Sequence, residues 1–335
     1  MAEVVAIGET MALVTPVRPE PLETAELFRV EAGGAESTVA LYLRELGHST
    51  AWVSRLGDDP LGRRVLAALE RHGVDTSRVT LDPGAPTGVY FKDPGPDGTA
   101  VHYYRAGSAA SRLSPADLAG VAPDGTRVIH LSGITAALSD SCRALVREVL
   151  DRFAGRGPAG AAGAAGAAAG ATSGTGPATA NRGTGEAGTG AGPLVSFDVN
   201  HRPGLWSAGT AAPVLLELAR RADVVFVGRD EAQTLWGTAT AEDVRALLPE
   251  PAHLVVKDGA VGATDFHDAL PGGAVFAAAH PIEVVEAVGA GDAFAAGYLA
   301  GLLDGEGSAG RLRLGHRLAA RSLAGTADFV PTADR

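Results

Sequence analysis

The stretch Val284-Val285-Glu286-Ala287-Val288-Gly289-Ala290-Gly291-Asp292-Ala293-Phe294 joins an extended apolar run, a Gly-Ala-Gly turn and an aspartate that opens a helix. The helix is predicted because Phe294, Tyr298 and Leu302 recur at intervals of four residues. Glycines at a helix N-terminus let backbone N–H groups converge on an anion, and the helix dipole favours negative charge there. A carboxylate beside a phosphate is useful if it accepts the proton of an attacking hydroxyl. The stretch therefore predicts phosphoryl transfer to an alcohol, with Asp292 as the base.

The alternative for this motif is a tight strand-to-helix turn with Asp292 as an ordinary first-turn acid. The chain contains only two lysines, Lys92 and Lys257, and this limits which kinase architectures are possible. A P-loop needs a lysine after its glycine turn, and a protein kinase needs a strand lysine on the phosphates. Neither lysine lies in such a motif, so both architectures are excluded.

Composition limits the class of protein. The chain has 335 residues, of which 46% are hydrophobic and 20% charged, enough for one large α/β domain or two smaller ones. A net charge of −11 argues against nucleic-acid and anionic-membrane partners. The first residues run directly into an apolar strand without a basic region, which predicts no signal peptide and a cytoplasmic protein. No apolar run is long enough to span a bilayer.

Short apolar strands alternate with amphipathic helices along most of the chain. Strands are predicted at 3–8, 50–56, 127–132, 194–198, 223–227 and 253–257. Helices are predicted at 36–47, 61–72, 140–154, 211–221, 230–236, 241–248, 290–304 and 310–324. This alternation predicts an α/β fold with a mostly parallel sheet covered on both faces.

Three segments interrupt the alternation. Residues of about 11–32 and 86–105 are extended and turn-rich, and we expect them to pair as a small β-sheet lid over the active site. Residues 156–193 are almost entirely Gly, Ala, Thr and Ser, which cannot bury enough surface to offset their ordering entropy. We therefore expect one domain over 1–335 with a disordered insertion at 156–193.

Glycine pairs and aromatic residues mark a further candidate site. Gly33-Gly34 precedes a predicted helix and permits close approach of a ligand, although Gly-Gly is also a common turn. The lid segments contain Tyr90 and Tyr103-Tyr104-Arg105. Tyrosine offers a flat face with a hydroxyl, and arginine a planar fork suited to carboxylate or phosphate. Cross-strand aromatic pairs with a surface arginine are the alternative.

Two strand ends add polar groups. Asp198-Val199-Asn200-His201-Arg202 follows the strand at 194–198, and α/β sheets bind ligands at the C-terminal ends of parallel strands. The segment 255–263 is a strand followed by a glycine turn, which either receives a nucleotide or forms a β-hairpin. The histidines form no metal-binding pattern with cysteine or acidic neighbours.

In this order, the N-terminal Gly-Gly segment and the C-terminal Gly-Ala-Gly-Asp resemble the two signatures of the ribokinase-like family of carbohydrate kinases. The resemblance covers nearly the whole chain except the insertion. Within the family the chain is most similar to the 2-keto-3-deoxygluconate kinases, through the segments 103–109, 130–135 and 198–206. The resemblance implies a three-layer α/β/α domain with a β-sheet lid, ATP and Mg²⁺ as cofactors, and a primary sugar hydroxyl as acceptor.

The resemblance also implies residue roles. Asp292 would be the catalytic base, beside an anion hole of Gly289, Ala290 and Gly291 N–H groups. The implied substrate-binding residues are Gly33, Gly34, Tyr90, Tyr103, Arg105 and Arg202. The implied nucleotide-binding residues are Lys257, Gly259 and Gly262, and Glu231 would hold the metal through water.

The chain departs from the family pattern at three places. The family commonly has Asp-Thr where this chain has Glu286-Ala287, an Asn-x-x-Glu motif where it has Gly228 and Glu231, and an Asn where it has Thr38. Two arginines in the pocket favour a sugar acid such as 2-keto-3-deoxygluconate over fructose or ribose. A catalytically silent sugar- or nucleotide-binding regulator would not need Asp292. A homo-oligomer is also expected from the resemblance.

Overall fold

The computed structural model describes residues 1–95, 98–122, 125–155, 192–270 and 272–332. The insertion predicted at 156–193 lies outside this part of the chain except for its last two residues. No helix in these ranges is both long enough and apolar enough to cross a membrane.

A large sheet forms the centre of the molecule, with strands in the order β13-β12-β11-β10-β9-β8-β1-β4-β5. Its strands are β1 (Val4–Ile7), β4 (Thr50–Gly57), β5 (Asp75–Asp82), β8 (Val128–Ser132), β9 (Leu194–Asp198), β10 (Val224–Gly228), β11 (His253–Asp258), β12 (Gly262–Phe266) and β13 (Ala274–Ala278). All neighbours pair in parallel except β12, which is antiparallel to both β11 and β13. The predicted mostly parallel sheet is confirmed.

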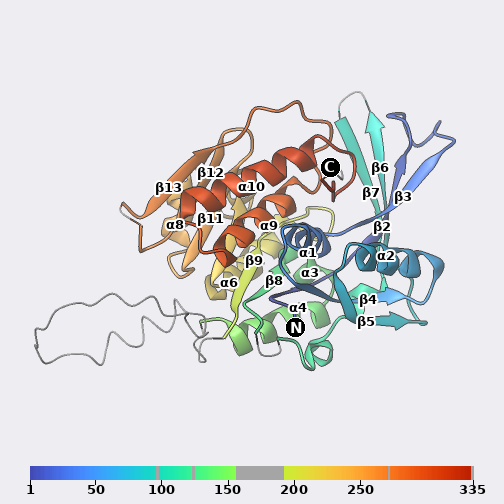
Figure 1. Cartoon of the computed structure of the whole chain (residues 1–335), viewed down its shortest axis with the longest axis horizontal. Coiled ribbons are helices and arrows are strands. Elements are labelled where there is room, and N and C mark those ends of the chain that lie inside the picture. Colours follow the sequence, from blue (N-terminus) through green and yellow to red (C-terminus); the bar gives the residue numbers. More distant parts are fainter. Residues whose placement is uncertain (96–97, 123–124, 156–191, 271, 333–335) are drawn as a thin grey trace, which may run out of the picture.

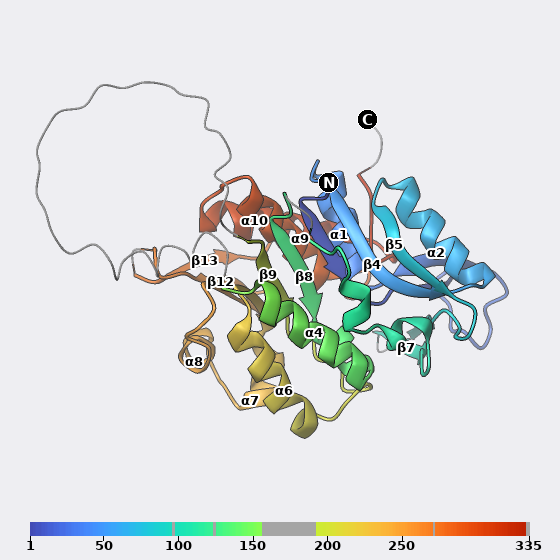
Figure 2. The same ribbon diagram turned by 90° about the horizontal axis from the view of Figure 1, so that it is seen from below.

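Helices cover both faces of this sheet and make three layers (Figure 2). The helices are α1 (Ala35–Glu45), α2 (Pro60–Arg71), α3 (Gly133–Leu138), α4 (Asp140–Phe153), α6 (Ala208–Arg221), α7 (Arg229–Trp236), α8 (Ala241–Leu247), α9 (Ala290–Leu303) and α10 (Ser308–Leu323). Successive side chains of a strand point to opposite faces. Accordingly, Val225 and Val227 pack in the cluster with α4, α6 and α7, whereas Val224 and Phe226 pack with α1, α9 and α10.

A smaller sheet stands beside the large one (Figure 1). It contains β2 (Met11–Pro16), β3 (Phe28–Gly33), β6 (Val89–Gly95) and β7 (Gly98–Tyr104) in the order β3-β2-β6-β7. The β2 and β6 strands pair in parallel, and each also pairs with an antiparallel neighbour. The prediction of a second, smaller sheet is therefore confirmed.

Several elements were not predicted from the sequence. The β5 strand was not predicted because it lies at the edge of the sheet and its side chains are exposed or half-buried. Its sequence, Asp-Thr-Ser-Arg-Val-Thr-Leu-Asp, is therefore largely polar. The α3 helix has only 6 residues and starts directly after the last residue of β8. The segment 255–263, which the sequence allowed to be either a nucleotide-binding turn or a hairpin, forms the β11–β12 hairpin.

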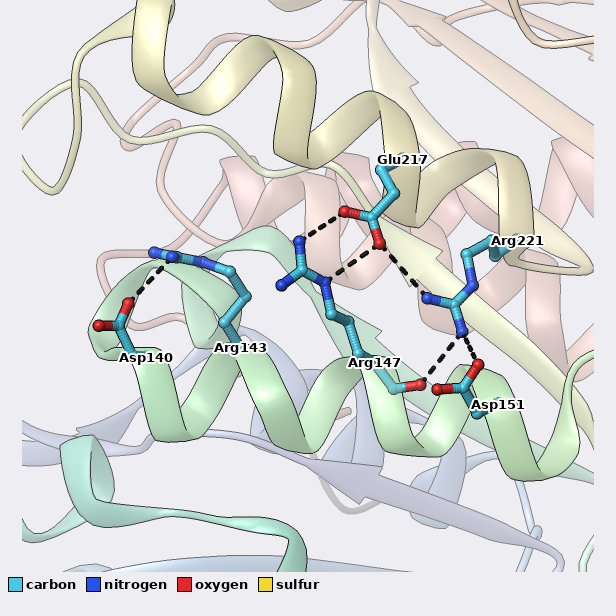
Figure 3. Close-up of polar contacts among 6 residues, drawn as sticks. All are labelled: Asp140, Arg143, Arg147, Asp151, Glu217 and Arg221. Carbon is cyan, nitrogen blue, oxygen red and sulfur yellow. Dashed lines mark hydrogen bonds and ion pairs between the residues drawn. The ribbon is translucent and has the colours of Figure 1, made fainter.

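An ion-pair ladder joins α4 to α6 on the outer surface (Figure 3). Arg147 donates two hydrogen bonds to Glu217, at 3.1 and 2.6 Å. Arg221, one turn after Glu217, also pairs with it and with Asp151 of α4. The ladder fixes the two helices against each other at the end of α4, next to the point where the described chain breaks off.

Candidate active site

The site is built around the N-terminus of α9. Gly289 has φ 90°, a left-handed conformation that favours glycine, and it turns the chain into the helix at Ala290. A Cβ on Gly289 would also lie 3.0 Å from Cα of Asp328, so the C-terminal segment packs directly on this turn. No side chain caps α9 among the described residues. The N–H of Ala290 donates only a long hydrogen bond of 3.4 Å to the Ala287 carbonyl, so the N–H groups of this turn can be offered to an anion.

Asp292 lies in the first turn of α9 with 7% of its surface exposed. Its Oδ1 accepts a hydrogen bond of 3.2 Å from Asn200 Nδ2. Burial raises the pKa of Asp292 from 3.8 to about 7, and the nearby Asp198 carboxylate adds to this increase. A carboxyl group with a pKa near neutrality is suited to accept a proton at physiological pH.

Lys257 places a positive charge at the same helix end. Its Nζ donates a 2.8 Å hydrogen bond to Asp198 Oδ2, and it would lie 3.4 Å from a Cβ on Gly291. Burial acts to lower the pKa of Lys257, but the carboxylates of Asp198, Glu231 and Asp292 together outweigh this and the pKa is raised. The ammonium therefore stays charged beside the free N–H groups, where a phosphate would be stabilised.

A cavity of about 340 Å³ opens at this point between the sheet edge and α9. Of the residues predicted from the sequence, it is lined by Asp292, Gly289, Gly291, Arg202, Lys257 and Glu231. We call it the donor cavity. Gly259 and Gly262 are not in its lining; they lie in and directly after the β11–β12 turn.

A second cavity, of about 40 Å³, lies between the smaller sheet and α9. Its lining includes all the predicted substrate-binding residues, Gly33, Gly34, Tyr90, Tyr103, Arg105 and Arg202. We call it the acceptor cavity. Both cavities are lined by Arg202, Val288 and Asp292, so they meet at the carboxyl group of Asp292. A hydroxyl on one side and a phosphate on the other could thus approach the same carboxylate.

The two arginines of the acceptor cavity differ in their partners. Arg105 forms an ion pair with Glu9, whose other oxygen accepts a 2.5 Å hydrogen bond from Ser108 Oγ. Arg202 has no carboxylate partner among the residues that the structure describes, and its Nη1 donates to the His201 carbonyl at 3.3 Å. The charge of Arg105 is therefore balanced within the protein, whereas that of Arg202 remains available to a ligand.

Comparison with known proteins identifies the family. The model of the pfkB family of carbohydrate kinases matches residues 1–157 and 173–330. The chain belongs to this family. A 2-dehydro-3-deoxygluconokinase of Thermoproteus tenax is 32% identical over 91% of this chain and 83% of the relative, and one of Bacillus subtilis is 30% identical over 99% and 94%. The solved PfkB protein of Polaromonas sp. JS666 is 34% identical, with a TM-score of 0.77 over 97% of each chain.

The chain is therefore an ATP-dependent carbohydrate kinase of the pfkB family, and its ribokinase-like α/β fold is confirmed. A solved 2-dehydro-3-deoxygluconokinase of Thermotoga maritima has the same fold, with a TM-score of 0.78 and 24% identity over 98% of this chain and 94% of that one. The family signature read in the sequence thus identified the correct family.

The sequence did not reveal Asp328 as a site residue of this carbohydrate kinase. Its carboxylate lines the acceptor cavity and accepts hydrogen bonds from Tyr90 Oη at 2.7 Å and from Lys92 Nζ at 3.1 Å. Lys92 is 1% exposed and also donates to the Thr326 carbonyl at 2.8 Å. The partners are separated by more than 230 residues in the chain, so no local pattern could reveal the contact.

Glu231 lies in the first turn of α7, where both its carboxylate oxygens accept backbone hydrogen bonds, from Gly228 N at 3.0 Å and from His201 N. Burial, together with Asp198, raises the pKa of Glu231 to about 7. No cluster of three or more metal-binding side chains occurs in the described part of the chain. Asp198 nevertheless has one buried carboxylate oxygen, Oδ1, without a hydrogen-bond partner there. This donor set fits Mg²⁺, which usually takes only one or two protein carboxylates and completes its shell with water and phosphate oxygens.

The departure at Glu286 has a structural role in the same loop. Glu286 Oε1 accepts hydrogen bonds from the backbone N–H groups of Ala287 at 2.8 Å and Val288 at 3.1 Å. The carboxylate thus shapes the turn that precedes Gly289.

Proposed function

We propose that this kinase transfers the γ-phosphoryl group of ATP to a primary hydroxyl of 2-keto-3-deoxygluconate or a closely related sugar acid. The observation that carries the proposal is that the donor and acceptor cavities meet at Asp292, beside an arginine that has no carboxylate partner in the described chain. The names of the Thermoproteus tenax and Bacillus subtilis relatives support the same acceptor.

In this mechanism Asp292 accepts the proton of the acceptor hydroxyl as that oxygen attacks phosphorus. Asn200 orients the carboxylate by its hydrogen bond to Oδ1. The N–H groups of Gly289, Ala290 and Gly291, with the ammonium of Lys257, stabilise the charge of the transferring group. Phosphoryl transfer needs little covalent chemistry from the protein, because positioning and charge stabilisation supply most of the catalysis.

Mg²⁺ is proposed as the metal cofactor, held by Asp198 and, through water, by Glu231. It would neutralise the phosphates of ATP. Lys257 keeps one oxygen of Asp198 in place and leaves the other for the metal shell.

Arg202 is proposed to bind the carboxylate of the sugar acid, and Tyr90, Tyr103, Gly33 and Gly34 to enclose its carbon chain. A neutral sugar such as fructose or ribose is the second candidate. The ion pair of Arg105 with Glu9 favours this second candidate, because it neutralises one of the two arginines that would otherwise bind a carboxylate.

The acceptor cavity, at about 40 Å³, is much smaller than the roughly 300 Å³ or more of usual ligand pockets. We therefore propose that the smaller sheet acts as a lid that moves away to admit the acceptor. Lys257, Gly259 and Gly262 are proposed to contact the nucleotide. The chain is further proposed to be a single cytoplasmic domain with an appended insertion at 156–193, and to form a homo-oligomer.

The test is ATP-dependent ADP release with 2-keto-3-deoxygluconate, fructose and ribose side by side, with Mg²⁺. The proposal expects turnover on the sugar acid, and an Arg202→Met variant whose KM for it rises by at least about tenfold. Arg229→Met is the matched control, because Arg229 pairs with Asp258 and does not line either cavity. Turnover on a neutral sugar alone would overturn the role of Arg202 but keep that of Asp292. ATP binding without turnover on any of the three would favour a silent regulator.

A further inference from the structure

A third cavity lies away from the reacting groups, between α2, β3 and the C-terminal segment. Its volume is about 340 Å³, the same as that of the donor cavity. Its polar lining consists of Glu31 from β3, Arg64 and Arg71 from α2, and His72. Its apolar wall includes Phe329 and Ala327 of the C-terminal segment. We call it the α2 cavity.

The α2 cavity is chemically suited to an anion. Arg71 has no hydrogen bond or ion pair within the described ranges, whereas Arg64 uses only its Nε, to the Val30 carbonyl at 3.0 Å. The Oε2 atom of Glu31 is buried and has no hydrogen-bond partner among the described residues. This oxygen is not exposed to the cavity, so a ligand there would not reach it. Two guanidinium groups with N–H donors that the described residues leave unused thus face the same space.

The cavity also offers a flat apolar surface. The ring of Phe329 packs edge-on against His72 at 5.0 Å and against Tyr42 at 4.8 Å. Desolvation and the neighbouring Arg71 lower the pKa of His72, so its ring is neutral at physiological pH. A compact carbon skeleton could lie against Phe329, with its anionic group toward Arg71.

We propose that the α2 cavity is a regulatory site for a small phosphate monoester with a compact carbon skeleton, such as a sugar phosphate. Its phosphate would pair with Arg64 and Arg71, and its carbon skeleton would lie against Phe329. The volume falls in the range of small-molecule sites, roughly 300–1,000 Å³. The proposal rests on this cavity alone and does not depend on which sugar the kinase phosphorylates.

The C-terminal segment connects this site to the acceptor cavity. Ala327 and Phe329 line the α2 cavity, whereas Asp328 between them lines the acceptor cavity and bonds to Tyr90 and Lys92. The β3 strand makes a second connection, because Glu31 lines one cavity and Gly33, two residues later, lines the other. A ligand that holds Phe329 in place would also hold Asp328 in place, and would therefore tighten acceptor binding.

The experiment uses the full chain, with glucose 6-phosphate as probe and glucose and inorganic phosphate as partial probes, in calorimetric titrations. Arg71→Met removes one guanidinium group from the cavity. Arg63→Met is its matched control, because Arg63 lies on the same helix but pairs with Asp58 outside the cavity. We expect glucose 6-phosphate to bind wild type and Arg63→Met equally, and Arg71→Met at least about tenfold more weakly. Glucose should bind none of them measurably.

A kinetic measurement tests the connection to the acceptor site. Saturating glucose 6-phosphate should lower the acceptor KM about fivefold in wild type and Arg63→Met, the lower end of usual coupling, and should not change it in Arg71→Met. The site would be refuted if Arg71→Met bound glucose 6-phosphate as tightly as Arg63→Met. It would also be refuted if no binding were detected at a probe concentration of about 10 mM, which is near the weakest affinities that are useful. Equal affinity for inorganic phosphate would show a plain anion contact and overturn the assignment to a phosphate ester. A KM unchanged by bound probe would overturn the regulatory role. Because titration needs no turnover, a negative result here is separate from failure of the proposed kinase reaction.

Discussion

Replacing Asp292 by asparagine separates its chemical role from its cost to stability. The change preserves the shape of the side chain and leaves an amide oxygen for the hydrogen bond from Asn200, which is 3.2 Å long in the wild type. The variant cannot accept the proton of the acceptor hydroxyl. We therefore expect turnover to fall by roughly 10²–10⁴, the usual contribution of a general base, while ATP binding is retained.

The same substitution should make the protein more stable. Burial raises the pKa of Asp292 from 3.8 to about 7, so the folded protein binds more protons than the unfolded chain between these values. The stability that this carboxyl contributes is therefore present at low pH and is lost as the pH rises from about 4 to about 7. At about 1.4 kcal/mol per pH unit, this carboxyl lowers the free energy of unfolding, relative to low pH, by about 4 kcal/mol at pH 8 and about 2 kcal/mol at pH 5.

The assay is urea unfolding of wild type and Asp292→Asn at pH 5 and pH 8, beside steady-state kinetics. The advantage of the variant should grow by about 2 kcal/mol between the two pH values. Asp230→Asn is a suitable control, because Asp230 lines the donor cavity and is not buried. A stability difference that does not change with pH would refute the buried, proton-binding carboxyl group. Near-normal turnover of Asp292→Asn would refute its role as base.

Further predictions concern pH and two ion pairs. In the wild type, kcat/KM for the acceptor should rise about tenfold per pH unit below about pH 7 and level off above it. The reason is that the carboxyl group of Asp292, with its pKa of about 7, must be ionised to accept a proton. A flat pH profile in buffered kinetics would contradict this. Lys92→Met should lower the free energy of unfolding, measured with urea, by about 3 kcal/mol, because it leaves the buried carboxylate of Asp328 without its ion-pair partner. An unchanged midpoint of urea unfolding would show that this ion pair is dispensable. Arg147→Met should cost only about 0.5–1 kcal/mol, and less at 1 M salt, since its pair with Glu217 is about two-fifths exposed on each side.

The fold could be predicted because its signals are local. Alternation of buried strands and amphipathic helices follows from the periodicity of apolar residues, and the predicted helix at 290–304 is observed as Ala290–Leu303. The Gly289 turn was also visible, since only glycine adopts its backbone conformation at low cost. The β5 strand had no such signal, because an edge strand with polar residues does not show the pattern of a buried one.

The candidate site could be predicted only in part. The positions of Asp292, Arg105 and Arg202 were visible as polar residues at strand and helix ends. The ion pair of Arg105 was not visible, because its partner Glu9 comes from another strand end, far away in the sequence. The sequence therefore treated the two arginines as equivalent, and the structure distinguishes them by the partner that one has and the other lacks.

Charge balance around the two cavities is the final argument for the reaction. Three ion pairs are closed within the protein: Arg105 with Glu9, Lys92 with Asp328, and Lys257 with Asp198. Each is buried on at least one side, where an unpaired charge would be costly. Within the described chain, Asp292 and Arg202 line both cavities without such a partner. In the proposed reaction one of them takes a proton and the other holds the carboxylate of the sugar acid. Because Asp292 has a hydrogen bond from Asn200 but no ion pair among the described residues, it keeps a raised pKa that suits a proton acceptor, which favours the kinase reaction over a silent binding protein.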